Sequence, residues 1–328
     1  MLSLRNRFVD NTVKTILVSL VSVPIALLCA LIGPSGFALP DPGNQMGMNI
    51  FMLRCARVAA GFAVGAALAS SGAVFQAVLR NPLADPYVLG VSGGAALGAS
   101  AAIVSGIAGL SPFAIPLCAF GTALLSLLAV VTLAASGRRA ASESGIILCG
   151  VIVSAMASAL LMILQTYASG SGLQSMTWWM LGSLQSVKPA LLCGCAACSL
   201  AGFAASFWLA RDLDALTLGG EMAHHLGIDA RRVSLAALGA ATLSAASAVA
   251  LAGLIGFVGL IVPHAARLVC GAGHRRLLPA SLFAGGALLV LCDTLARVAC
   301  PPRELPVGVV TALLGGPFFI WLLRRGAH

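Results

Sequence analysis

Charged and aromatic side chains are scarce in this 328-residue sequence. Only 9% of the residues are Asp, Glu, Lys or Arg, and only 6% are aromatic, with two tyrosines in the whole chain. Soluble globular domains carry about 25% charged residues, so the composition excludes a soluble protein. The scarcity of aromatic residues argues against an outer-membrane barrel, which has aromatic girdles at both membrane interfaces.

The sequence also lacks the motifs of nucleotide and metal chemistry. It contains no Gly-x-x-x-x-Gly-Lys-Ser/Thr loop, so it does not cradle ATP phosphates by that route. Its ten cysteines lie mostly within apolar runs and do not form a disulfide framework. On a helix, Cys193 points away from Cys195 and Cys198, so these three thiolates do not converge on one ion. We expect no cofactor and no metal in this chain.

Apolar residues dominate what is present. They make up 59% of the sequence, and the mean hydropathy is +1.01. With 37 glycines and abundant alanine, this composition favours helices that pack closely through small side chains. We expect an all-α, polytopic membrane protein with a single domain over residues 1–328 and about ten spans. The predicted spans are residues 16–32, 56–79, 87–107, 112–135, 144–167, 189–210, 232–252, 256–270, 277–297 and 306–323.

Two of these spans need comment. The first follows basic residues and resembles a secretory signal, but its run of 17 residues exceeds the usual length, and no small-x-small cleavage site follows. We expect a retained helix. The eighth span is the shortest, and whether it crosses fully is left open.

The net charge of +9 carries topological information. A basic soluble protein would suggest nucleic-acid binding, but in a membrane protein cations gather on the cytoplasmic side. With the N-terminus inside, 14 of the 19 Lys and Arg residues are cytoplasmic and five are external. The cytoplasmic set is Arg5, Arg7, Lys14, Arg80, Arg138, Arg139, Arg211, Arg231, Arg232, Arg267, Arg275, Arg276, Arg324 and Arg325; the external set is Arg54, Arg57, Lys188, Arg297 and Arg303. We expect both termini inside and no nucleic-acid partner.

A polar stretch with regularly spaced apolar residues runs over residues 212–229, between the sixth and seventh spans. Its apolar residues form a stripe, Glu221 suits the first turn of a helix, and Gly227 suits the left-handed residue that ends one. This pattern predicts a short cytoplasmic helix with an exposed apolar stripe, which is typical of a surface that docks a partner. The alternative is an interfacial helix that lies on lipid.

Several motifs together resemble one family. Glu221-Met222-Ala223 followed by Gly227 resembles the coupling signature of ABC import permeases. Four further stretches occur in the family's order. They are RNPLADP at 80–86 with LGVSGG at 89–94, GLIGFVGLIVPH at 253–264, HRRLLP at 274–279, and ELPVGVVTA at 304–312 with GGPFF at 315–319. From about residue 50 to its end, the chain resembles the permeases that import iron-siderophores, heme and vitamin B12.

The resemblance implies a ten-helix fold like that of the vitamin B12 importer, acting as a homodimer in the bacterial inner membrane. It implies two ATP-binding cassette subunits, which hold ATP and Mg²⁺, and a periplasmic substrate-binding protein as partners. The chain itself would not be an enzyme. The cargo would be a large iron chelate, with heme favoured over a ferric siderophore or vitamin B12. Its coupling residues would be Gly220, Glu221, Met222, Ala223, Leu226 and Gly227.

The resemblance also implies roles at both ends of the pathway. At the outer face, Arg54, Arg57 and Arg297 would receive acidic residues of the binding protein; anchoring of the first two to lipid phosphate is the alternative. At the inner face, the turns that contain Asn81 and Leu83, and Ser142 and Glu143, would close the pathway. Asn81 also suits a plain turn, and the charge of Glu143 is unusual for the family.

Two polar groups within the predicted spans bear on the rival class, an ion-coupled secondary transporter. Asp293 and Arg297 are four residues apart, so they are expected to pair on one helix face, and no chain of intramembrane acids accompanies them. The pairing argues against a proton relay. The stretch MTWWMLG at 176–182 is expected to anchor a short external helix at the membrane interface, with substrate contact as the second possibility.

Overall fold

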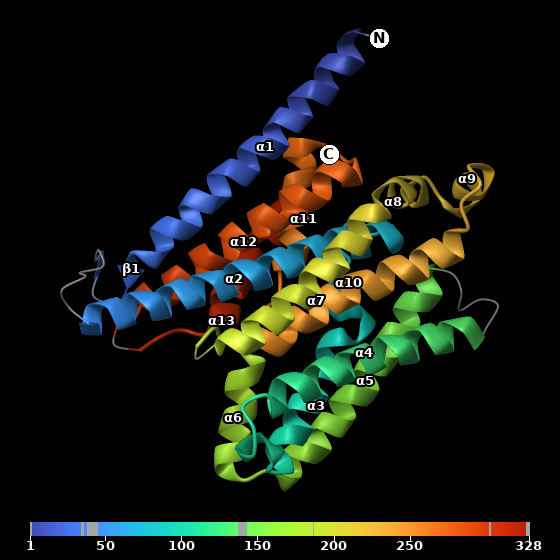
Figure 1. The fold of residues 1–328 in the computed structure, drawn as a ribbon. Helices are drawn as coiled ribbons and strands as arrows, with labels where there is room; N and C mark the ends of the chain where they lie inside the picture. Colours follow the sequence, from blue (N-terminus) through green and yellow to red (C-terminus); the bar gives the residue numbers. More distant parts are fainter. Residues whose placement is uncertain are drawn as a thin grey trace.

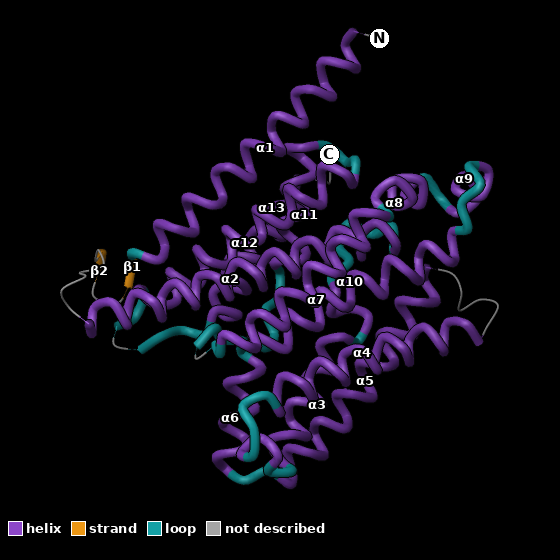
Figure 2. Tube along the Cα trace, viewed as in Figure 1, coloured by secondary structure: helices purple, strands orange, loops and turns teal. Residues whose placement is uncertain are grey.

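The computed structural model describes residues 2–33, 36–37, 45–136, 143–185, 187–301 and 303–325, and these are almost entirely helical (Figures 1 and 2). The elements are α1 Leu2–Ala30, β1 Ile32–Gly33, β2 Gly36–Phe37, α2 Gln45–Val78, η1 Pro86–Leu89, α3 Val91–Val104, η2 Ile107–Gly109, α4 Ala114–Ser136, α5 Glu143–Tyr167, α6 Gly170–Met180, α7 Pro189–Trp208, α8 Ala210–Thr217, α9 Gly220–His225, α10 Ala230–Ala252, α11 Val258–Cys270, α12 His274–Val298 and α13 Val307–Arg325. Each predicted span contains one α-helix of this series, which confirms the all-α prediction.

The helices differ in length. Within the described residues, seven are long and apolar enough to cross a membrane. The eighth predicted span is α11, whose 13 residues cover about 20 Å at 1.5 Å per residue, less than a hydrocarbon layer of about 30 Å. The third span is also shorter than predicted. Its first residues form the 3-10 helix η1, and Gly90 with φ 83° separates η1 from the 14-residue α3.

Helix α2 lies at the centre of the molecule. From Val64 to Val78 all its side chains are buried, and α12, α10, α11, α7 and α1 pack around it (Figure 1). Small residues make this possible: a Cβ at Gly65 would collide with the backbone of Gly285 in α12, and one at Gly72 with the backbone of Gly259 in α11. Because the backbones touch at these crossings, the core is built from close helix contacts.

A second group of helices, α3 to α6, packs beside this centre against α10 (Figure 1). The backbone break between α10 and α11 is fixed here by a side chain from the other group. The hydroxyl of Tyr87 in η1 accepts a hydrogen bond from the Ile255 amide and donates one to the Ile255 carbonyl, both at 3.0 Å. These two bonds satisfy backbone groups that a broken helix would leave buried and unpaired.

The two ends of the molecule differ. The two chain ends marked in Figure 1 lie on the same side as α8 and α9, while the short β1–β2 pair lies at the opposite side with the start of α2. The residues that the sequence assigns to the cytoplasmic and outer faces are therefore separated by the length of the helices.

Candidate functional site

The segment predicted to couple to a partner projects from the end of the helix body. Helix α8 is anchored by Leu213 and Leu216, which are buried, and α9 by Ala223, which is fully buried. Leu218, Met222 and Leu226 are 67%, 50% and 59% exposed, and Glu221 is also exposed. The three apolar side chains are exposed within a segment that Ala223 holds in place, as a surface that receives a partner requires.

The sequence predicted one helix in this segment, and the structure has two. Gly219 adopts φ 110°, which breaks the helical path after α8 and lets α9 start in a new direction. The predicted end of α9 is confirmed. Gly227 has φ 78°, its amide donates to the carbonyl of His224, and the amide of Ile228 donates to the carbonyl of Ala223. This is the hydrogen-bond pattern of a Schellman cap.

One link between the coupling segment and the helix body was not predicted from the sequence. The Asp214 carboxylate in α8 accepts the backbone amide of His274 at 2.9 Å and lies 2.6 Å from His274 Nδ1. His274 is only 2% exposed and is the first residue of α12. The bonds therefore fasten α8 to the start of the helix that packs most extensively on α2. Sixty positions separate the two residues, so no local pattern in the sequence could indicate the contact.

The inner turn after α2 is held by its own side chains. Asn81 Oδ1 accepts the Leu83 amide at 2.9 Å, and Asp85 accepts the Tyr87 amide at 2.9 Å. Burial raises the pKa of Asp85 to about 6, although the Tyr87 amide opposes that shift. Leu83 is 45% exposed. The hydrogen bond of Asn81 is that of a turn initiator, so its geometry agrees with the alternative structural role.

The second predicted inner turn is only partly described. Ser142 lies outside the described residues, as does the side chain of Glu143, whose backbone begins α5. These two residues stay a prediction.

The outer end of the molecule contains a cluster of four charged side chains, which we call the outer ion cluster: Arg57, Asp293, Arg297 and Glu304. Arg57 donates to Asp293 through Nε at 3.0 Å and through Nη2 at 2.8 Å, and to Glu304 through Nη1 at 2.8 Å. Arg297 Nε lies 3.2 Å from Asp293 Oδ2, which confirms the predicted pair in α12. Two positive and two negative groups thus neutralise one another.

The outer ion cluster also fixes the loop that enters α7. Gln185 donates to Glu304 at 2.8 Å. Burial would raise the pKa of Glu304, but hydrogen bonds from Arg57 and Gln185 and the charges of both arginines lower it overall. The carboxylate is therefore held in its charged form. Neither Gln185 nor the pairing of Arg57 with Asp293 was predicted, because the partners are up to 236 positions apart.

These contacts change the expected role of one docking residue. Arg297 is only 3% exposed, and its terminal nitrogens donate to the carbonyls of Ile32 and Cys29. A buried guanidinium that is bound on all sides does not offer itself to another protein, so the structure argues against docking through Arg297. Arg57 remains 16% exposed. Arg54 is half-buried, and its guanidinium lies against Gly33 in β1.

Two further predictions concern the short helix α6 and metal binding. Helix α6 contains the predicted interfacial stretch, with Met176 buried and Trp178 49% exposed. Among the described residues, no group of three or more His, Cys, Asp or Glu side chains is arranged to hold a metal ion.

The described residues form a bundle of helices, seven of them long and apolar enough to cross a membrane, with a projecting segment at one end and an ion cluster at the other; this is the architecture of a multi-pass membrane protein. The chain matches the model of the FecCD transport family over residues 16–325 and belongs to that family. Accordingly it is the permease subunit of a bacterial ABC importer, with ATPase and binding-protein partners, and is neither an enzyme itself nor the carrier of a cofactor.

Named relatives support this assignment. The chain is 39% identical to the cobalamin import permease BtuC of Halobacterium salinarum over 302 residues, covering 91% of this chain and 79% of that protein. It is 37% identical to the hemin transport permease HmuU of Yersinia pestis over 282 residues, covering 83% and 82%. It is 38% identical to the vitamin B12 import permease BtuC of Escherichia coli over 340 residues, which covers both chains fully.

Among solved structures, the chain is similar to a metal-chelate type ABC transporter in an inward-facing conformation. The TM-score is 0.86 at 29% identity, and the match covers 95% of this chain and 98% of that one. This similarity confirms the predicted fold class.

Proposed function

We propose that two copies of this chain form the translocation pathway of an inner-membrane importer for a large iron chelate. The whole chain, residues 1–328, would act as one permease domain with both termini in the cytoplasm. Two ATPase subunits would bind α8 and α9, and a periplasmic binding protein would deliver the cargo. The observation that carries the proposal is the coupling segment: an exposed apolar stripe, capped at Gly227 and fastened to α12 through Asp214.

In this mechanism the ATPase would contact the exposed side chains of Glu221, Met222 and Leu226. Closure of the paired ATPases would move α8 and α9, and the bonds of Asp214 to His274 would pass that movement to α12. At the inner turn, Asn81 and Leu83 would open and close the pathway. At the outer face, we retain Arg57 as a docking residue, since part of its side chain is exposed beside Glu304. Such ion pairs set register and encounter rate.

For the cargo, we propose heme first. The support is the hemin permease among the relatives, and vitamin B12 and ferric siderophore are the alternatives. The B12 permeases are as similar to this chain as the hemin permease is, so the substrate must be decided by transport.

The test is uptake into proteoliposomes that contain this chain and its ATPase. The binding protein and one labelled substrate are added outside the vesicles, and hemin, vitamin B12 and a ferric siderophore are tested separately. We expect ATP-dependent uptake of hemin. Uptake of only another chelate would replace the substrate and leave the importer intact. Uptake driven by a proton or sodium gradient without ATP would instead overturn the proposed mechanism.

The coupling role has its own test. Glu221→Ala and Met222→Ala should reduce ATP-dependent uptake at least tenfold by weakening ATPase attachment. The control is Thr166→Ala, an exposed substitution near the end of α5 and outside the coupling segment, which should leave uptake near its original rate. Unchanged uptake and unchanged ATPase stimulation in both α9 variants would contradict the assignment.

A further inference from the structure

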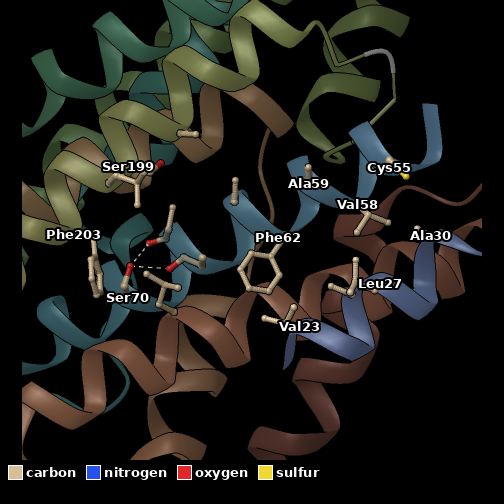
Figure 3. Close-up of a pocket in the computed structure, with 17 residues that line it drawn as sticks. Val23, Leu27, Ala30, Cys55, Val58, Ala59, Phe62, Ser70, Ser199 and Phe203 are labelled. Carbon is tan, nitrogen blue, oxygen red and sulfur yellow. Dashed lines mark hydrogen bonds between the residues drawn. The ribbon is translucent and has the colours of Figure 1, made fainter. Parts of the chain in front are cut away.

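A groove on the membrane-facing side of the molecule is not used by the proposed transport mechanism. It has a volume of about 480 Å³ and lies on α2 between α1 and α7 (Figure 3). Val23 and Leu27 of α1 form one wall, and Phe203 of α7 forms part of the other. Leu27 and Leu200 are 66% and 62% exposed, so the groove opens on the apolar surface of the helix bundle.

The chemistry of the lining restricts the ligand. Almost every lining side chain is apolar, and the two serines are already satisfied. Ser70 donates to the Ala66 carbonyl at 2.7 Å, and Ser199 lies 2.6 Å from the hydroxyl of Ser247. A polar cargo would find little to bond with here, whereas a hydrocarbon chain needs no hydrogen-bond partner.

The dimensions restrict the ligand further. The floor runs along α2 from Cys55 to Ser70, which is about 22 Å at 1.5 Å per residue. The volume of about 480 Å³ and that length together give a groove roughly 8 Å across, once the radius of a water molecule, about 1.4 Å, is added on each side. An α-helix with side chains is about 10–12 Å across, so a helix of another protein does not fit within the groove. A single extended acyl chain is the slender apolar group that a bilayer supplies.

A charge lies at one end of the groove. Ala30 and Cys55 line that end. Arg54 is the neighbour of Cys55, and its guanidinium lies against Gly33 in β1, three residues after Ala30. Arginine binds phosphate groups well, because its planar fork presents several N–H donors.

We propose that this groove binds one phospholipid, with an acyl chain along α2 between α1 and α7 and its phosphate group at Arg54. The lipid would fill the space between α1 and α7 and hold α1 to the body beyond its contacts with α12. This assigns Arg54 to lipid phosphate and leaves Arg57 to the binding protein.

Native mass spectrometry of the delipidated, purified full-length chain would test the proposal. The probes are phosphatidylglycerol, a diacylglycerol with the same two chains and no phosphate, and inorganic phosphate. The matched variants are Ala196→Trp, which fills the groove, and Ala197→Trp, which adds the same bulk one residue along α7 on an exposed position. Ala196→Leu is the milder filling variant if the tryptophan prevents folding.

We expect one tightly bound phosphatidylglycerol per protomer in the original protein and in Ala197→Trp. Ala196→Trp or Ala196→Leu should raise its Kd at least tenfold. Arg54→Gln should weaken phosphatidylglycerol severalfold and leave diacylglycerol unchanged, while Arg303→Gln, an exposed outer substitution, should change neither. Equal lipid binding by Ala196→Trp and Ala197→Trp would overturn the proposal. So would displacement of the lipid by inorganic phosphate alone, or efficient crosslinking of two Leu200→Cys protomers through this face.

Discussion

At the scale of single residues, the outer ion cluster holds buried charges that depend on one another. Asp293 is 2% exposed and is shared by two arginines from different helices. Removing a charge from water is costly unless it is paired and hydrogen-bonded, so each member depends on the others. The cluster connects α2 and α12 with the loop before α7, through Gln185, and with the loop before α13, through Glu304.

The first prediction concerns Asp293→Asn. The substitution leaves two arginines with one carboxylate, so we expect a loss of about 3 kcal/mol in the free energy of unfolding. The control is Asp229→Asn, which breaks a pair with Arg232 whose side chains are 51% and 87% exposed. Such surface pairs contribute at most about 1 kcal/mol. Chemical unfolding in detergent micelles checks both, and equal losses would contradict the account.

The second prediction concerns the pH dependence that Glu304 contributes. Because its pKa in the folded protein is below the ordinary value of 4.5, its stabilising effect is complete above that pH and is lost as the pH falls through the lowered pKa. The gap in Tm between the original protein and Glu304→Gln should therefore be constant near pH 7 and shrink below about 4.5. A gap that grows in acid would refute the pairing with Arg57.

At the scale of elements, the coupling segment depends on two glycines with positive φ, at Gly219 and Gly227. They let two short helices turn sharply where one longer helix was expected from the apolar pattern. The pattern could not show the break, because Leu218 and Met222 keep the i, i+4 spacing of one helix face across it.

The third prediction follows from Gly227. In Gly227→Ala the left-handed residue carries a Cβ, which costs about 1 kcal/mol, so we expect faster hydrogen exchange in α9 and weaker coupling of ATPase activity to uptake. Gly239→Ala is the control. It lies within α10 with open space around it, and there Ala is favoured by up to about 1 kcal/mol. Exchange in α9 that is the same in both variants would count against the cap.

The fourth prediction concerns the crossing of α2 and α12. Gly65→Ala would place a Cβ against the carbonyl of Gly285, and such overpacking costs about 1–3 kcal/mol. Gly121→Ala in α4 adds the same methyl group where nothing lies within 4 Å. Thermal unfolding should separate the two variants, and similar Tm values would mean that the crossing adjusts without strain.

At the scale of the whole molecule, the order and number of the apolar spans could be predicted, because a membrane requires long apolar segments with few charges. Hydropathy located each of them, and cation counting predicted which face each end belongs to. Hydropathy did not predict two places where the chain departs from a continuous helix. One is the 3-10 helix η1 before α3, and the other is the turn at Gly219 between α8 and α9. In both places glycine conformation decided the outcome.

The candidate site was predicted less completely than the fold. The Asp293–Arg297 pair and the helix end at Gly227 are local in sequence, so spacing and residue type sufficed for them. The coupling role of the α9 residues comes from the family resemblance and stays a prediction. The contacts of Arg57 with Asp293 and of Asp214 with His274 join distant parts of the chain, and no periodicity encodes such a pairing. Arg297 illustrates this, since the resemblance gave it a docking role and the folded chain buries its side chain against the carbonyls of Ile32 and Cys29.

The continuity of α12 has a consequence for how the chain tolerates insertions. From His274 to Asp293 it spans 19 positions, or about 28 Å. His274 is bonded to Asp214 in α8 and Asp293 to Arg57 in α2, so both ends are attached to other helices. One inserted residue would turn Asp293 by about 100° relative to His274, so one of the two attachments would fail whichever residue was added. Insertion scanning should find α12 intolerant at every interior position, even where its side chains face lipid. The number of residues between His274 and Asp293 is therefore constrained more strictly than the identity of most residues in this helix.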